Sequence, residues 1–128
     1  MTYLDTSVAL AHILSEPRQP TMSLWSEPLV ASRLLEYETW TRVHARNLAG
    51  THGPAVRALL SRVAMLEVVP PVVERVRHPF PAPVRTLDAL HLATADYLRT
   101  QGQHVEIATY DERLALTARA MGFAVLAL

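Results

Sequence analysis

Aspartate is rare in this chain, and three of the four aspartates stand where a predicted helix begins. Among the 128 residues, aspartate occurs only at Asp5, Asp88, Asp96 and Asp111. Asp5 and Asp111 each follow a short extended run and precede a helical pattern, while Asp88 lies in the first turn of another predicted helix. Because parallel strands end at one edge of a sheet, we expect these three carboxylates to gather at that edge.

Carboxylates gathered at one edge repel each other, and a bound divalent cation is the usual compensation. Oxygen ligands, in a chain without cysteine, favour Mg²⁺ or Mn²⁺ over zinc. A simpler explanation exists for each acid, since Asp5, Thr6 or Ser7 would also serve as a helix cap. The pattern therefore indicates either a metal site or separate helix caps, and its recurrence at three places favours the site.

A fourth acid is expected from the helix that Ser32 caps. Glu36 and Glu38 compete for this position, because residues two apart point in directions about 200° apart around a helix and only one can face the site. Arg42 follows Glu38 by four residues and is placed to pair with it. The spacing leaves the choice between the two glutamates open.

Strand patterns alternate with helical patterns along the whole chain. We expect strands at residues 2–4, 29–31, 66–69, 105–109 and 123–126. Helices are expected at residues 8–14, 33–47, 55–65, 72–77, 87–100 and 111–121, with the glycines and proline of 50–54 acting as a break. This alternation predicts an α/β fold with a central, mostly parallel sheet flanked by helices, and the length suits a single domain spanning 1–128.

The composition excludes several classes of protein. Twelve arginines balance twelve acids, and the chain contains neither lysine nor cysteine. A P-loop, a Schiff-base enzyme, a disulfide and a thiol nucleophile are therefore excluded. A neutral chain must bind RNA through a local arginine cluster. No apolar run reaches the length of a membrane span and no signal peptide precedes Asp5, so we expect a cytoplasmic protein with no membrane association.

Four acidic segments occur in order along the chain. They are Leu4-Asp5-Thr6-Ser7, Ser32 with Glu38 six residues on, Arg85-Thr86-Leu87-Asp88-Ala89-Leu90-His91-Leu92-Ala93, and Thr109-Tyr110-Asp111. These segments resemble the acidic motifs of PIN domains, in particular those of the VapC ribonuclease toxins of bacterial toxin–antitoxin modules. The resemblance covers essentially the whole chain in length and in motif order.

The resemblance implies a PIN-like three-layer sandwich and a Mg²⁺- or Mn²⁺-dependent endoribonuclease. Its catalytic and metal-binding acids would be Asp5, Glu38, Asp88 and Asp111, so the resemblance selects Glu38 over Glu36. Thr109 would assist near the metal, as would Thr6 or Ser7, and Arg113 and Arg85 are candidates to hold the RNA backbone. The resemblance also implies a homodimer, a cognate antitoxin, and a tRNA target ahead of messenger RNA.

Two alternative functions use the same residues. One alternative is a catalytically weak PIN module that binds RNA or a protein, and another is a housekeeping RNA-processing nuclease. A metal-dependent phosphatase is disfavoured, because it would usually need a second aspartate where Ser7 stands. His91, three residues after Asp88, is expected to be a buried histidine with satisfied hydrogen bonds rather than a ligand.

Overall fold

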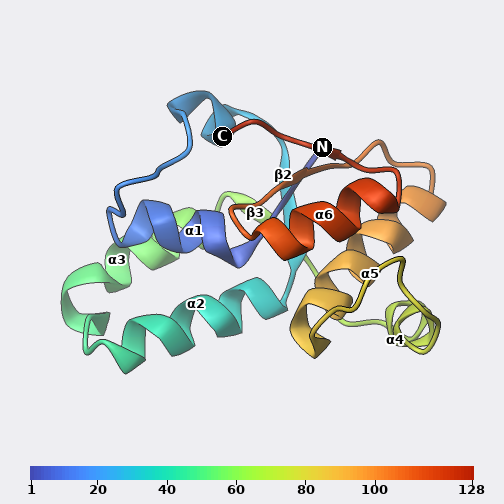
Figure 1. Ribbon diagram of the computed structural model, residues 1–128. Helices are drawn as coiled ribbons and strands as arrows, with labels where there is room; N and C mark the ends of the chain where they lie inside the picture. The colour runs from blue at the N-terminus through green and yellow to red at the C-terminus, as the bar shows by residue number, and fades with distance from the viewer.

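The computed structural model describes residues 1–128 and contains one five-stranded sheet at its centre (Figure 1). The strands are β1 (Thr2–Leu4), β2 (Leu29–Ser32), β3 (Val63–Leu66), β4 (Glu106–Ala108) and β5 (Ala124–Val125). Their order across the sheet is β3-β2-β1-β4-β5, and every neighbouring pair is parallel. The α/β class predicted from the sequence is therefore confirmed, and the sheet is wholly rather than mostly parallel.

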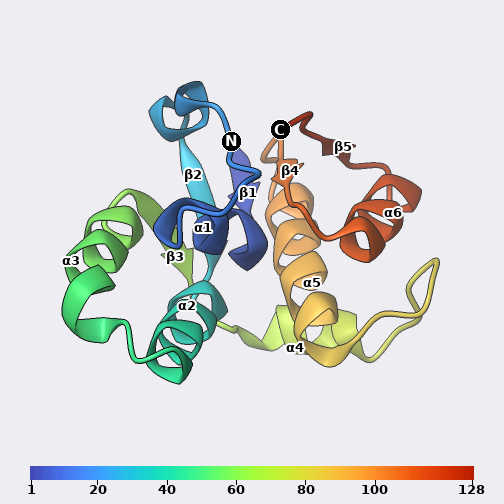
Figure 2. The same ribbon diagram turned by 60° about the vertical axis from the view of Figure 1, so that its left-hand side comes forward.

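Helices cover both faces of this sheet and make the fold a three-layer sandwich. The helices are α1 (Thr6–Ile13), α2 (Leu34–Ala45), α3 (Ala49–Leu60), α4 (Pro70–Val76), α5 (Thr86–Thr100) and α6 (Glu112–Ala120), with a 3₁₀ turn at Met22–Ser26. Figure 2 shows α1, α2 and α3 on one side of the sheet and α5 and α6 on the other, with α4 packed against α5.

The pleat of the three central strands divides the core into two halves. Residues in register point the same way, so one face is formed by Tyr3, Val30 and Ile107 and the other by Leu4, Ala31 and Ala108. The first face is buried by Leu92 of α5 and Leu114 of α6, and the second by residues of α1, α2 and α3. Both faces of a parallel sheet are thereby covered, which is why its strands read as apolar runs.

Strand β1 lies at the centre, and the chain leaves it in one direction to β2 and β3 before returning to β4 on its other side. Where the strand order reverses, the loops that follow β1 and β4 run in opposite directions, and a crevice opens at the carboxyl ends of these two strands. Asp5 follows β1 directly, and Asp111 comes three residues after the end of β4. The topology therefore brings both acids to the crevice.

The region around the third strand differs from the sequence prediction. We expected residues 50–54 to break the chain, but α3 runs through Gly50, Gly53 and Pro54, because Val56 and Leu59 of this helix are buried in the core. The strand begins at Val63 instead of Leu66, since Val63 pairs with Leu29 in the buried part of the sheet. Tertiary packing has overridden local propensity here. No helix of the structure is both long enough and apolar enough to span a bilayer.

Candidate active site

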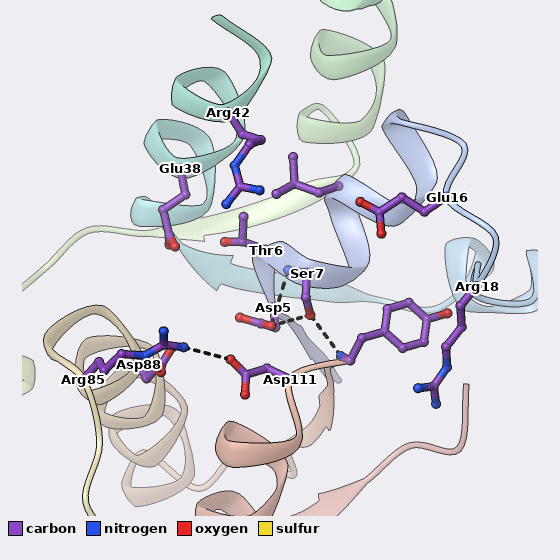
Figure 3. Close-up of a pocket in the computed structure, with 12 residues that line it drawn as sticks. Asp5, Thr6, Ser7, Glu16, Arg18, Glu38, Arg42, Arg85, Asp88 and Asp111 are labelled. Carbon is purple, nitrogen blue, oxygen red and sulfur yellow. Dashed lines mark hydrogen bonds and ion pairs between the residues drawn. The ribbon is translucent and has the colours of Figure 1, made fainter. Parts of the chain in front are cut away.

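A pocket of about 530 Å³ lies at the carboxyl edge of β1 and β4 (Figure 3). Five acidic side chains line it. Four come from different elements of the fold, namely Asp5 at the end of β1, Glu38 of α2, Asp88 of α5 and Asp111 before α6, and the fifth, Glu16, comes from the loop after α1. The remaining lining residues are Thr6, Ser7, Leu10, Arg18, Arg42, Arg85 and Tyr110.

Asp5 is held rigidly at the floor of the pocket. Its backbone N–H extends the β1–β4 ladder by donating to the Ala108 carbonyl at 3.0 Å. Its Oδ2 accepts three hydrogen bonds, from the Ser7 N–H at 3.3 Å, the Ser7 hydroxyl at 2.6 Å and the Thr109 hydroxyl at 2.8 Å. Asp5 therefore caps α1 and also lines the pocket, and its second oxygen, Oδ1, has no protein donor.

The two hydroxyls that bind Asp5 also join the turn after β1 to the turn after β4. Ser7 Oγ accepts from the Tyr110 N–H at 2.9 Å, and Thr109 Oγ1 accepts from the Asp111 N–H at 3.0 Å. We call these contacts the Ser7–Thr109 bridge. Thr109 is buried behind Asp5 and does not line the pocket. The hydroxyl of Thr6 is buried without any hydrogen-bond partner.

Asp88 and Asp111 are linked by the guanidinium of Arg85. Its Nε lies 3.3 Å from Asp88 Oδ2, and its Nη2 lies 3.3 Å from Asp111 Oδ2. Asp111 also caps α6, because its Oδ1 accepts from the backbone N–H groups of Arg113 and Leu114. Burial raises the pKa of Asp88, and the charges of Asp111 and Asp5 raise it further, while Arg85 acts in the opposite direction.

Glu38 rather than Glu36 faces the pocket. Glu36 points away and forms an ion pair with Arg33 at 2.9 Å. Glu38 Oε1 contacts Nε2 of the buried His91 at 2.5 Å. Burial lowers the pKa of His91, but the Glu38 hydrogen bond and the negative charges of Glu38, Asp5 and Asp88 outweigh it, so the net pKa is raised.

Two arginines line the pocket without an ionic partner. Arg42 makes no ion pair with Glu38, contrary to the pairing expected from their spacing, and its guanidinium extends beside Glu38 in Figure 3. Arg18 lies over the ring of Tyr110, 4.6 Å from its centroid. Arg113 does not line this pocket and instead faces an adjacent recess that also contacts Arg85 and Asp88.

The sequence offered no signal for several of the lining residues. Arg18 and Glu16 follow the end of α1 in a loop without periodicity, so nothing in the pattern brought them to the acids. In the sequence, Tyr110 is distinguished only as the middle residue of the motif Thr109-Tyr110-Asp111. The contact between His91 and Glu38 joins residues 53 positions apart and could not be read from local spacing.

The family model described as the PIN domain matches residues 2–120. The chain belongs to the PIN domain family. Two Mycobacterium tuberculosis PIN-domain relatives, ribonuclease VapC35 and ribonuclease VapC47, are each 32% identical to it. The alignment with VapC35 covers 99% of this chain and 96% of the relative, and the alignment with VapC47 covers 96% and 93%.

Solved structures share the PIN fold over the full chain. A toxin–antitoxin complex from Klebsiella pneumoniae matches with a TM-score of 0.71 at 18% identity, covering 99% of this chain and 97% of that one. The crystal structure of M. tuberculosis VapC20, a sarcin-ricin loop cleaving toxin, matches with a TM-score of 0.65 at 22% identity, covering 97% of both chains. At these identities the two structures establish the fold of the present chain.

The acids of this PIN domain have the donor chemistry that a hard divalent cation requires. Five carboxylates line one pocket, the Thr6 hydroxyl beside them has no partner, and the Arg85 guanidinium already bridges two of the acids as a cation. No three histidine or acidic side chains converge as a single ligand group. The carboxylate and hydroxyl oxygens that line the pocket are the ligands that Mg²⁺ and Mn²⁺ prefer.

Proposed function

We propose that this PIN-domain protein is a metal-dependent endoribonuclease that hydrolyses phosphodiester bonds of RNA as the toxin of a toxin–antitoxin pair. The convergence of four carboxylates from four elements on one pocket carries the proposal. The full-length relatives named ribonuclease VapC support the same activity. A module that only binds RNA would gain nothing from these carboxylates, because they repel each other and also repel phosphate.

Asp5, Glu38, Asp88 and Asp111 are the residues that would hold Mg²⁺ or Mn²⁺. The bound ion supplies an activated water and neutralises charge on the phosphate that is cleaved. Within the chain, the Ser7–Thr109 bridge fixes Asp5 and leaves its Oδ1 free toward the pocket. Arg85, which is exposed, would be available to contact the substrate if a cation took its place beside the two aspartates.

Arg42 and Arg18 would hold the RNA backbone on either side of the acids. Neither guanidinium is neutralised by a carboxylate, so both are available for phosphate, which a guanidinium binds through two parallel hydrogen bonds. The chain has no net charge, and attraction for RNA therefore depends on these local cations. Arg113 is a less direct candidate because it faces the neighbouring recess.

The partners that we propose are a structured RNA, with tRNA ahead of messenger RNA, a cognate antitoxin and a second copy of the chain. The toxin–antitoxin complex among the solved structures supports the antitoxin. A shallow groove beside the pocket runs between α1, α2 and the start of α5, and the apolar side chains of Tyr37 and Leu87 are exposed along it. An amphipathic antitoxin segment would bury these side chains and direct a basic residue toward the acids.

Cleavage of RNA by the purified protein tests the proposal. We expect cleavage of structured RNA with Mg²⁺ or Mn²⁺, loss of cleavage in EDTA, and loss of cleavage in the Asp5→Asn and Asp111→Asn variants, each with a native circular dichroism spectrum. Undiminished cleavage by both variants would contradict a catalytic role for the acidic pocket.

Glu38→Gln and Glu36→Gln form a matched pair in the same assay. The two glutamates lie two residues apart on α2, and only Glu38 lines the pocket. Glu38→Gln should reduce cleavage by orders of magnitude, and Glu36→Gln should leave it within about twofold, as for most surface substitutions. If Glu36→Gln reduced cleavage more than Glu38→Gln, Glu36 rather than Glu38 would be the fourth acid of the site. A neighbouring gene whose product inhibits cleavage would identify the protein as a toxin. If no neighbouring gene encodes such an inhibitor, a housekeeping nuclease is favoured.

A further inference from the structure

A buried chain of hydrogen bonds leads from the sheet to Glu38. The Ser32 backbone N–H, at the end of β2, donates to the Tyr3 hydroxyl oxygen at 3.1 Å. Tyr3 Oη lies 2.7 Å from His91 Nδ1, and His91 Nε2 contacts Glu38 Oε1. Tyr3 and His91 are each 2% exposed, and Ser32 is fully buried. The chain therefore crosses from two strands through α5 to α2 and reaches solvent only at Glu38.

The donors and acceptors of this chain determine which way it is oriented. An ionised Glu38 carboxylate can only accept, so the hydrogen of its contact with His91 is carried by Nε2. In the neutral imidazole, Nδ1 then has no hydrogen and accepts from the Tyr3 hydroxyl, whose oxygen accepts from the Ser32 N–H. A doubly protonated His91 would also donate from Nε2, so Glu38 is the acceptor in either charge state.

Glu38 has a single polar partner, whereas Asp5 and Asp111 each have several; Asp88 also has one, but that partner is the exposed Arg85 rather than a buried group. Asp5 accepts three hydrogen bonds, and Asp111 accepts two from the backbone in addition to Arg85. His91 is the only polar partner of Glu38. A glutamate side chain also has more rotatable bonds than an aspartate and loses more conformational entropy when it is fixed.

We propose that His91 is a positioning residue that fixes the Glu38 carboxylate toward the metal-binding pocket, and that the Tyr3 hydroxyl in turn fixes the His91 imidazole. The inference rests on the proposed metal-dependent activity, because it assigns a role toward the ion that the acids would hold. Hydrogen bonds to a ligand carboxylate from groups behind it orient the ligand and tune its affinity for metal. His91 is thus more than a buried histidine with satisfied hydrogen bonds.

Binding of Mn²⁺ to the metal-free protein, followed by isothermal titration calorimetry, tests this role without an activity assay. His91→Leu should raise the Kd for Mn²⁺ about tenfold, a typical effect of losing a partner behind a metal ligand. His91→Gln, which keeps a side-chain donor, should restore part of the affinity. Tyr3→Phe, which keeps the packed ring and removes only the hydroxyl, should raise the Kd severalfold.

Thr117→Val is the matched control, since it removes a buried hydroxyl of α6 that bonds only to the Arg113 carbonyl within its own helix. It should leave the Kd unchanged even if it lowers the Tm. Combining each His91 variant with Glu38→Gln separates positioning from general destabilisation. In the Glu38→Gln background, His91→Leu should cause no further loss of Mn²⁺ affinity, because the group it positions is already altered.

The outcomes distinguish this inference from the proposed function. If wild type binds Mn²⁺ and Glu38→Gln weakens binding, while Tyr3→Phe and both His91 variants leave the Kd unchanged, the positioning role is overturned and the metal site stands. Equal losses from His91→Leu with and without Glu38→Gln would overturn it as well. Absence of Mn²⁺ binding by folded wild type overturns both proposals. If His91→Leu does not fold, Tyr3→Phe and His91→Gln carry the test.

Discussion

At the scale of single residues, Asp88 makes the metal-free site sensitive to pH. Burial and the nearby charges of Asp111 and Asp5 raise its pKa, so the folded protein binds a proton at Asp88 more readily than the unfolded chain does. The stability that this protonation contributes is fully present below the unfolded value of 3.8 and is lost as the pH rises through the higher folded value.

The variant Asp88→Asn should therefore raise the Tm of the metal-free protein at pH 7, because it removes a carboxylate that is partly desolvated. The advantage over wild type should shrink as the pH falls and vanish near pH 4. Thermal melts of both proteins in EDTA across this range measure the effect. A pH-independent difference would mean that another property of the substitution, such as helix capping, is responsible.

Arg42 and Arg46 allow a matched test of substrate binding by one helix. Both are exposed, but Arg42 lines the pocket and Arg46, at the C-terminal end of α2, does not. Arg42→Gln should raise the KM for RNA with a smaller change in kcat, and it should reduce the slope of log affinity against log salt by about one. Arg46→Gln should do neither. Equal effects of the two variants would indicate diffuse electrostatic attraction.

The same residues indicate how far the sequence could predict the site. Asp5 and Asp111 could be assigned to one edge, since a parallel sheet and a following helix suffice to place them, and the structure brings Glu38 and Asp88 into the same pocket. Their catalytic role remains a prediction. The position of Arg42 next to Glu38 but not paired with it, and the contact of His91 with Glu38, depend on how α2 and α5 pack across the sheet, which local spacing does not encode.

At the scale of elements, the Ser7–Thr109 bridge connects two turns that lie 102 residues apart in sequence. Thr109→Val should lower the free energy of unfolding by about 1–3 kcal/mol, because Asp5 loses a donor and the Asp111 N–H loses an acceptor in a largely buried place. It should also reduce cleavage by loosening Asp5. Urea unfolding and RNA cleavage measure the two effects.

Thr117→Val again serves as a comparison, since it removes a buried threonine hydroxyl whose bond stays within one helix. Its cleavage rate should equal that of wild type. Equal losses of cleavage in the two threonine variants would show that stability alone, rather than the bridge, limits the activity.

The fold class and the PIN resemblance predicted from the sequence are confirmed, whereas α3 and β3 were each predicted several residues too far along the chain at both ends. The α/β class follows from alternation over the whole chain, so errors in single elements do not affect it. The start of α3 and of β3 depends on contacts that form only in the folded protein, namely the burial of Val56 and the pairing of Val63 with Leu29. Glycine and proline at 50–54 predict a break when these contacts are not known.

At the scale of the whole molecule, we predict self-association from the exposed apolar residues. Tyr37, Leu87 and Leu116 are 61%, 46% and 63% exposed, on three different helices. A chain with no net charge has little electrostatic protection against self-association. We expect a homodimer at micromolar concentration, measured by multi-angle light scattering, and a monomer under these conditions would contradict it.

The antitoxin is tested separately by expressing the neighbouring gene together with this one. Its product should co-purify with the wild-type protein, and Tyr37→Asp, which places a charge on the groove beside the pocket, should weaken the complex. Retention of full affinity by this variant would place the antitoxin elsewhere on the surface.

The central position of β1 also has a consequence for how the protein is made. The first strand to leave the ribosome needs both β2 and β4 as neighbours, and β4 begins only at Glu106. Thr109 and Asp111, which lie next to Asp5 in the folded protein, are therefore synthesised only in the last quarter of the chain. A nascent chain carries none of the assembled carboxylate pocket until synthesis is nearly over. The position of β4 in the sequence therefore delays assembly of the acidic pocket until the chain is almost complete.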